Sequence, residues 1–269
     1  MAHTSVLYEV REGVGTITLN RERVLNALNL DVLQRLSEAA EQAASDDNVW
    51  VVVLRGAGRA FCSGIDRTAL SRGEIDASFY REIARATNLL EDMPKLSICV
   101  MHGWSIGGGL QVASACDVRL ASDDALLEFG ATRHGLLPDA TILRIARIIG
   151  MGRAKQLALL NERVSPEQAL AWGLVNWVAP AGELERVLES VVESAMHASR
   201  TAVAESKALL QQSFHRDPRT MIEELVAAQM ICHQSWELEV ANAAWAERKS
   251  EVRFWPPPRA KGGGPGEPA

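Results

Sequence analysis

The chain has 269 residues, of which 47% are hydrophobic and 23% charged, enough for the core of a globular protein. The net charge of −6 and the absence of a basic run argue against nucleic acid as a partner. Since the sequence has neither a signal-peptide core nor a run of about 18 apolar residues, we expect a cytoplasmic protein with no membrane partner.

The first elements in chain order are a hairpin and a helix. Residues 7–10 and 14–19 alternate in part between apolar and polar positions, which predicts two paired strands. Residues 20–29 read as an irregular loop. Apolar residues at helical spacing then predict a helix over 30–45, with Asn29 available as its N-cap.

Three buried strands are predicted next. The short apolar runs lie at residues 50–54, 96–101 and 118–121, and an amphipathic helix is expected over 78–92, between the first two. Because strands alternate with helices at this spacing, the sequence predicts an α/β fold with a mainly parallel sheet.

The C-terminal part of the chain reads as helical, apart from a short strand over 174–178. Helices are expected over 140–149, 152–161, 165–172, 182–199, 201–213 and 218–248. We therefore expect a core over residues 1–199 and a helical oligomerisation segment over residues 200–256. Residues 257–269 are rich in Pro and Gly and are expected to be disordered.

The four cysteines, Cys62, Cys99, Cys116 and Cys232, are far apart and form no Cys-x-x-Cys motif. They therefore suggest buried, reduced thiols rather than zinc ligands or a disulfide framework. No metal site is expected.

Two of the buried strands end in loops of small residues that turn toward a helix. The first loop ends in Phe61-Cys62-Ser63-Gly64-Ile65-Asp66, and the second contains Gly107-Gly108-Gly109. In parallel α/β sheets ligands bind at the carboxyl ends of strands, where the N–H groups of helix starts have no partner. One N–H from each loop, aimed at one point, would form an oxyanion hole. Three glycines alone are equally compatible with a tight turn and close helix packing.

In this order and spacing the loops resemble those of the crotonase, or enoyl-CoA hydratase/isomerase, superfamily. The resemblance covers residues 5 to about 255. It also includes Arg23-Val24-Leu25-Asn26-Ala27-Leu28-Asn29, Cys116-Asp117, Gly152-Arg153-Ala154 and the segment 163–175 with its Ala-x-x-x-Gly-Leu-Val motif. The resemblance implies a β-β-α superhelical core, a C-terminal all-helical segment, and a homotrimer or dimer of trimers.

The resemblance further implies the binding of an acyl-CoA thioester, with CoA as part of the substrate and no separate cofactor. The carbonyl oxygen would lie between the backbone N–H groups of Ile65 and Gly108. Trp104, Gln111 and Leu136 would border the acyl group. Contacts to CoA would come from Ala27, Ala60, Asp66, Arg67, Thr68, Lys249 and Phe254.

Hydratases of this family use two glutamates as an acid/base pair for water, and neither is present here. The first position holds Gln111, whose amide can orient a water molecule but cannot exchange protons near neutral pH. The second falls on Ala131 or, in another register, on Arg133. The sequence therefore argues against hydration by two glutamates.

One carboxylate, Asp139, stands where some single-acid members of the family carry an aspartate. An oxyanion hole stabilises an enolate, so one carboxylate can move a proton between carbons conjugated to the thioester. The alternative is that Asp139 only caps the next helix. Two other candidates near the pocket are Glu128, for which a solvent-facing or ion-paired strand end is expected, and His134, for which a surface position is expected.

Three functions follow in order of preference. The first is double-bond isomerisation of an enoyl-CoA by Asp139. The second is an enoyl-CoA hydratase, and the third is a non-catalytic acyl-CoA-binding protein. The direction in which Asp139 points separates the first from the third.

Overall fold

The computed structural model describes residues 4–139 and 142–257. The chain forms two compact units, Met1–Glu193 and Ser194–Ala269. Most of the tail that we expected to be disordered, from residue 258 onward, lies outside the described residues, as do residues 140 and 141. Each unit is described by itself below.

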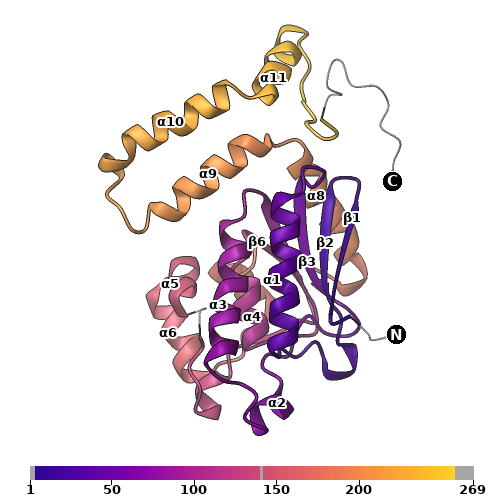
Figure 1. Ribbon diagram of the computed structural model, residues 1–269, viewed down its shortest axis with the longest axis vertical. Helices are drawn as coiled ribbons and strands as arrows, with labels where there is room; N and C mark the ends of the chain where they lie inside the picture. The colour runs from indigo at the N-terminus through magenta and orange to yellow at the C-terminus, as the bar shows by residue number, and fades with distance from the viewer. Residues whose placement is uncertain (1–3, 140–141, 258–269) are drawn as a thin grey trace. The chain divides into compact units, whose positions relative to one another are not determined.

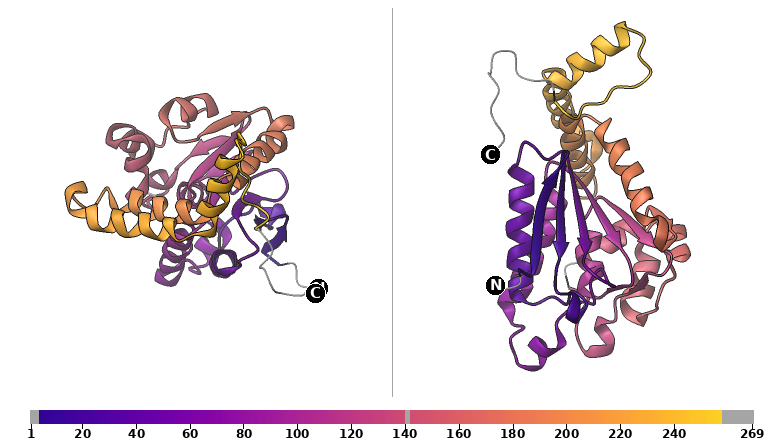
Figure 2. Two further views of the ribbon diagram at one scale, coloured as in Figure 1. Left: turned by 90° about the horizontal axis from the view of Figure 1, so that it is seen from above. Right: turned by 90° about the vertical axis from the view of Figure 1, so that its right-hand side faces the viewer.

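The first unit is built on a six-stranded sheet, which confirms the mainly parallel sheet predicted from the sequence. The strand order is β1-β2-β3-β4-β6-β8, in which only the β1–β2 pair is antiparallel. The right-hand view of Figure 2 shows the strands fanning apart with α1 along one side. The strands are β1 (Val6–Arg11), β2 (Val14–Leu19), β3 (Val51–Gly56), β4 (Leu96–Met101), β6 (Val118–Ser122) and β8 (Trp177–Ala179).

Three helices lie across one face of this sheet, α1 (Leu30–Ser45), α3 (Ala77–Asp92) and α4 (Gly108–Ser114) (Figure 1). Asn29 caps α1 as predicted, because its side chain accepts a hydrogen bond of 3.0 Å from the Val32 N–H. Central strands β3 and β4 are buried almost throughout, as expected of parallel strands covered on both faces.

A second, two-stranded sheet was missed by the sequence analysis. Strand β5 (Trp104–Ile106) pairs in parallel with β7 (Leu126–Glu128), with Ile106 opposite Glu128. Strands of three residues are too short for a periodic pattern to identify them. Strand β5 leads directly into the glycine turn at residues 107–109, so this small sheet positions the second loop.

The strand expected over 174–178 begins later, at Trp177. Gly173 adopts the left-handed backbone that ends α7, and the Leu174 N–H donates to the Ala169 carbonyl. Leu174 is therefore buried as part of a helix cap rather than a strand. The other elements of this unit are η1 (Glu22–Val24), α2 (Arg67–Ser71), η2 (Ala131–His134), α5 (Ile142–Ile149), α6 (Met151–Leu160), α7 (Pro166–Trp172) and η3 (Ala181–Glu183), and α8 (Leu184–Met196) spans the boundary between the units.

The second unit is helical, as expected, but the single helix predicted over 218–248 is wrong. The segment forms η4 (Pro218–Met221), α10 (Ile222–His233) and α11 (Trp236–Ala246), after α9 (Arg200–Gln212). The Ser235 hydroxyl accepts a hydrogen bond of 3.3 Å from the Leu238 N–H, which starts a new helix at this point. No helix in the described part of the chain is long and apolar enough to cross a membrane.

Candidate active site

The two glycine loops touch each other through their backbones. Gly64 has φ +91°, and a Cβ added to it would lie 2.9 Å from the carbonyl oxygen of Ile106 and 3.3 Å from the nitrogen of Gly108. Gly107 also has a positive φ, of 55°. Only glycine fits both the conformation and the close approach at residue 64.

Hydrogen bonds fix the two loops to each other and to their surroundings. The Cys62 N–H donates to the Trp104 carbonyl (2.8 Å), and the Ile106 N–H donates to the Cys62 carbonyl (3.0 Å). The Gly107 N–H donates to the carbonyl of Glu128 at 2.8 Å, which ties the glycine turn to β7. The backbone at the site is therefore held in place before any ligand arrives.

The N–H groups of Ile65 and Gly108 lie on either side of this contact. Around Ile65, Leu28 bonds to the flanking Gly64 carbonyl (2.7 Å) and accepts from the Asp66 N–H (2.8 Å). Within the described residues, neither the Ile65 nor the Gly108 N–H meets a protein acceptor. Both residues border a cavity of about 500 Å³. Two N–H donors therefore remain available at the cavity, from two different loops.

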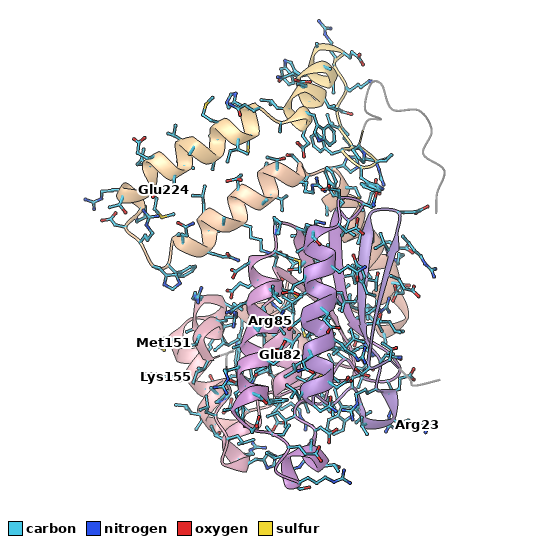
Figure 3. The ribbon with its side chains drawn as sticks, viewed as in Figure 1. Arg23, Glu82, Arg85, Met151, Lys155 and Glu224 are labelled. Atoms are coloured by element: carbon cyan, nitrogen blue, oxygen red, sulfur yellow. The ribbon has the colours of Figure 1, made fainter. Side chains whose placement is uncertain are left out.

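The cavity collects most of the site residues predicted from the sequence. Its lining includes Ala27, Ile65, Asp66, Arg67, Thr68, Trp104, Gly108, Gln111 and Leu136. Near it, Arg23, labelled in Figure 3, lies in the η1 turn that precedes Ala27.

Four predicted site residues are not part of this lining. Ala60 is buried, and its carbonyl accepts a hydrogen bond of 2.8 Å from the side chain of Asn26. Asp139 follows the lining residues Leu136 and Leu137. Lys249 and Phe254 belong to the second unit, where Phe254 is buried beside Trp236 and Lys249 pairs with Glu247 at 2.7 Å. Their contact with CoA stays a prediction.

Asp66, predicted from the resemblance to contact CoA, is the N-cap of α2. Its carboxylate accepts from the backbone N–H groups of Thr68 (3.0 Å) and Ala69 (3.2 Å), and it pairs with Arg21 at 2.9 Å. Burial raises the pKa of Asp66, but the hydrogen bonds from Ala69, Arg21 and Thr68 and the positive charge of Arg21 lower it, and the net shift is downward. Asp66 therefore stays charged and holds the start of α2 beside Ile65.

Asp139 does not have the backbone of an ordinary helix cap. Its φ is +29°, whereas an N-cap residue usually has an extended backbone. Such a conformation is uncommon for a residue other than glycine, and it often marks a functional position. Burial and, next, the negative charge of Asp139 raise the pKa of Tyr80 on α3. The Asp139 carboxylate therefore lies close enough to Tyr80 for its charge to disfavour ionisation of the tyrosine.

Glu128 is an ion-paired strand end, as expected. It is buried, and its two carboxylate oxygens lie 3.3 Å from Arg133 and 3.4 Å from Arg163. Glu128 lines the cavity, and so does Arg163, which was not among the site residues predicted from the sequence. His134 is exposed, as expected, but it also lines the cavity and lies 3.2 Å from the guanidinium of Arg67.

The positions expected for two catalytic glutamates border the cavity without a carboxylate. Gln111 is 3% exposed, and Ala131 lies in the first turn of η2. Among the residues that the structure describes, no group of three or more His, Cys, Asp or Glu side chains could hold a metal ion.

Known proteins similar to this chain carry the names of acyl-CoA hydratases and isomerases. The profile of the enoyl-CoA hydratase/isomerase family matches residues 9–251. The short-chain-enoyl-CoA hydratase of Clostridium acetobutylicum is 28% identical over 94% of this chain and 99% of its own length. The 1,2-epoxyphenylacetyl-CoA isomerase of Escherichia coli is 35% identical over 63% of this chain and 68% of its own. A crystal structure of an enoyl-CoA hydratase from Bacillus anthracis has a TM-score of 0.86 at 28% identity, covering 93% of this chain and 98% of that one.

Proposed function

This chain belongs to the enoyl-CoA hydratase/isomerase family, and we propose that it isomerises a double bond of an enoyl-CoA. The observation that carries the proposal is the pair of unmatched N–H groups at Ile65 and Gly108, on loops locked together at the cavity. The names of the relatives include both hydratases and isomerases, so the preference for isomerisation rests on the residues around this pair.

The first step is polarisation of the thioester carbonyl. Two N–H donors aimed at its oxygen stabilise the negative charge that develops when a proton leaves the carbon chain. Removing one such donor typically costs about 3–4 kcal/mol of transition-state stabilisation. Because both donors belong to the main chain, this step needs no particular side chain.

The second step is proton transfer by Asp139. A single carboxylate can take a proton from carbon 2 of a 3-enoyl-CoA, which leaves a dienolate, and return the proton to carbon 4, so that the double bond comes to lie between carbons 2 and 3. Asp139 follows a segment that lines the cavity through Leu136 and Leu137, and its strained backbone supports a role beyond capping. Gln111 and Ala131 offer no competing acid or base.

Two other functions remain candidates. Hydration of a 2-enoyl-CoA would require a base for water where Gln111 and Ala131 now stand. A non-catalytic acyl-CoA-binding protein is favoured by one specific observation, that the cavity lining includes neither Asp139 nor a carboxylate at position 111 or 131. We further propose assembly as a homotrimer or dimer of trimers, to be tested by the mass of the particle in solution.

The test compares wild type, Asp139→Asn and Glu128→Gln with 3-enoyl-CoA and 2-enoyl-CoA as substrates. We expect isomerisation by the wild type, a loss of about 10²–10⁴-fold in Asp139→Asn, and a smaller effect in Glu128→Gln. Isomerisation that survives Asp139→Asn would remove the role of Asp139. Rapid hydration by the wild type would establish the hydratase, and tight binding without turnover would establish the binder.

A further inference from the structure

The cavity contains a cation that the proposed reaction does not use, Arg163. It lies in the loop before α7, where the neighbouring Val164 N–H donates to the carbonyl of Leu127 in β7 at 2.9 Å. This pairing brings the Arg163 side chain to the carboxylate of Glu128, at 3.4 Å. In the described part of the chain, Arg163 has no other polar contact, so most of its five N–H donors have no protein acceptor.

Glu128 does not need Arg163 for its charge to be balanced. Arg133 already pairs with the other carboxylate oxygen at 3.3 Å and is itself fastened to the Asn161 carbonyl at 2.8 Å. Arg133 does not line the cavity, whereas Glu128 and Arg163 do. The cluster therefore carries one net positive charge, and its unused donors are on the arginine that borders the cavity.

The charges on the α2 side of the cavity follow the same pattern. Asp66 is neutralised by Arg21, which does not line the cavity, so the cation that remains there is Arg67. Each carboxylate of the lining is thus paired with an arginine outside the lining, and both arginines of the lining are in excess. A cavity of this kind favours a ligand with more than one anionic group.

We propose that Arg163, oriented by Glu128, binds a second anionic group of the ligand, the terminal carboxylate of a short dicarboxylic acyl-CoA. The proposal rests on the proposed function, because it takes the thioester carbonyl to lie at Ile65 and Gly108. Glu128 stands opposite Ile106 in the small sheet, and Ile106 directly precedes the glycine turn, so the Glu128–Arg163 ion pair is at the strand that leads into the carbonyl site. A guanidinium binds a carboxylate through two parallel hydrogen bonds, and Glu128 restricts its rotation from the far side.

The experiment measures dissociation constants by calorimetry for glutaryl-CoA, succinyl-CoA and the neutral pentanoyl-CoA and butyryl-CoA. The variants are Arg163→Met and, as the matched control, Arg133→Met. The two arginines have the same partner, and their side chains are equally exposed, at 56% and 57%, but only Arg163 borders the cavity. Breaking the Glu128 ion pair is therefore common to both variants, and loss of the proposed site is confined to one.

We expect wild type to bind at least one dicarboxylic thioester about tenfold or more tightly than its neutral counterpart. Arg163→Met removes that preference and leaves pentanoyl-CoA binding unchanged, whereas Arg133→Met keeps the preference. The proposal is overturned if wild type has no preference, or if both variants lose it equally. In those cases neutral thioesters still bind, so the thioester site on which the proposed function depends is unaffected; if no thioester binds, both proposals fail.

A phosphate of CoA is the other possible source of the anionic group. Acetyl-CoA and its 3′-dephospho form separate the two sources, because neither carries an acyl carboxylate. We expect Arg163→Met to leave both affinities unchanged. If the variant weakens only the 3′-phosphorylated form, Arg163 binds the phosphate, and its assignment to the acyl group is wrong.

Discussion

The nitrogen of Gly108 lies 3.3 Å from the point that a Cβ on Gly64 would occupy. We therefore expect Gly64→Ala to push the two loops apart. The added methyl group also meets the Ile106 carbonyl at 2.9 Å, and alanine is strained at a φ of +91°. Acyl-CoA binding should weaken at least tenfold, and the free energy of unfolding should fall by about 1–3 kcal/mol.

The matched control is Gly152→Ala, in the first turn of α6 between the labelled Met151 and Lys155 (Figure 3). A Cβ on Gly152 has no neighbour within 4 Å. Because alanine restricts the unfolded chain more than glycine does, the free energy of unfolding of this variant should rise by about 0.4–1 kcal/mol. Its acyl-CoA binding should equal that of the wild type. Calorimetry and chemical denaturation measure both effects. Equal binding by the two variants would contradict the contact between the loops as the frame of the site.

A buried ion pair fastens α5 to α3 and should matter for stability. Arg144, with a side chain 7% exposed, donates to Glu91 (2.6 Å) and to Asn88 (2.6 Å). Glu91→Ala leaves the buried guanidinium without its main counter-charge. We therefore expect the free energy of unfolding, measured with a denaturant, to fall by about 3–5 kcal/mol. The control is Arg85→Ala on the same helix, which removes an exposed guanidinium paired with Glu41 and Glu82 (Figure 3). This change should lower the free energy of unfolding by less than about 1 kcal/mol.

The sequence alone predicts those helices and strands whose buried residues recur at regular spacing within one segment. The helix over 30–45 and the strand over 96–101 were predicted at their observed bounds, because each shows its buried positions in one continuous pattern. The glycine loops were also recognisable, since their spacing is a property of the chain itself. Periodic burial and the spacing of the glycine loops together predicted the sheet, the loops and most of the residues that line the cavity.

The sequence could not show what depends on pairing between distant segments. Strands β5 and β7 are three residues long and are defined by their pairing with each other. That pairing also places Glu128 at the cavity. The positive φ of Asp139 was not predicted either, because an aspartate just before a helix is typical of an N-cap with an extended backbone. The new helix at Ser235 was missed because apolar residues continue through it.

Thiol reactivity should separate one cysteine from the other three. Cys62, Cys99 and Cys116 are buried, and Cys232 is half-buried. Burial raises the pKa of Cys62 to about 12, so its reactive thiolate is scarce at neutral pH. At pH 8 we expect Ellman's reagent to modify Cys232 first, and the three others only after unfolding. Rapid modification of Cys62, located by peptide mass, would show that the first glycine loop opens readily.

Tyr8 should make the fold weaker in alkaline solution. Burial and, next, the charge of Asp46 raise the pKa of Tyr8 to about 12, compared with 10.0 for the free side chain. Above pH 10 the unfolded chain loses this proton before the folded chain does, so stability falls between about pH 10 and 12. Tyr8→Phe should flatten this part of the pH profile of unfolding and leave stability at pH 7 undiminished. An unchanged profile would show that Tyr8 ionises normally in the folded protein.

The frame of the proposed carbonyl site consists of main-chain atoms, held by the Gly64 contact and by the Gly107–Glu128 hydrogen bond. Natural selection can therefore exchange the side chains at positions 111, 131 and 139 one at a time without dismantling the frame. A lineage can lose one proton-transfer group and acquire another while it still recognises the same thioester. Evolution of a new reaction on this scaffold then needs few substitutions, and its starting point is a protein that already binds the substrate.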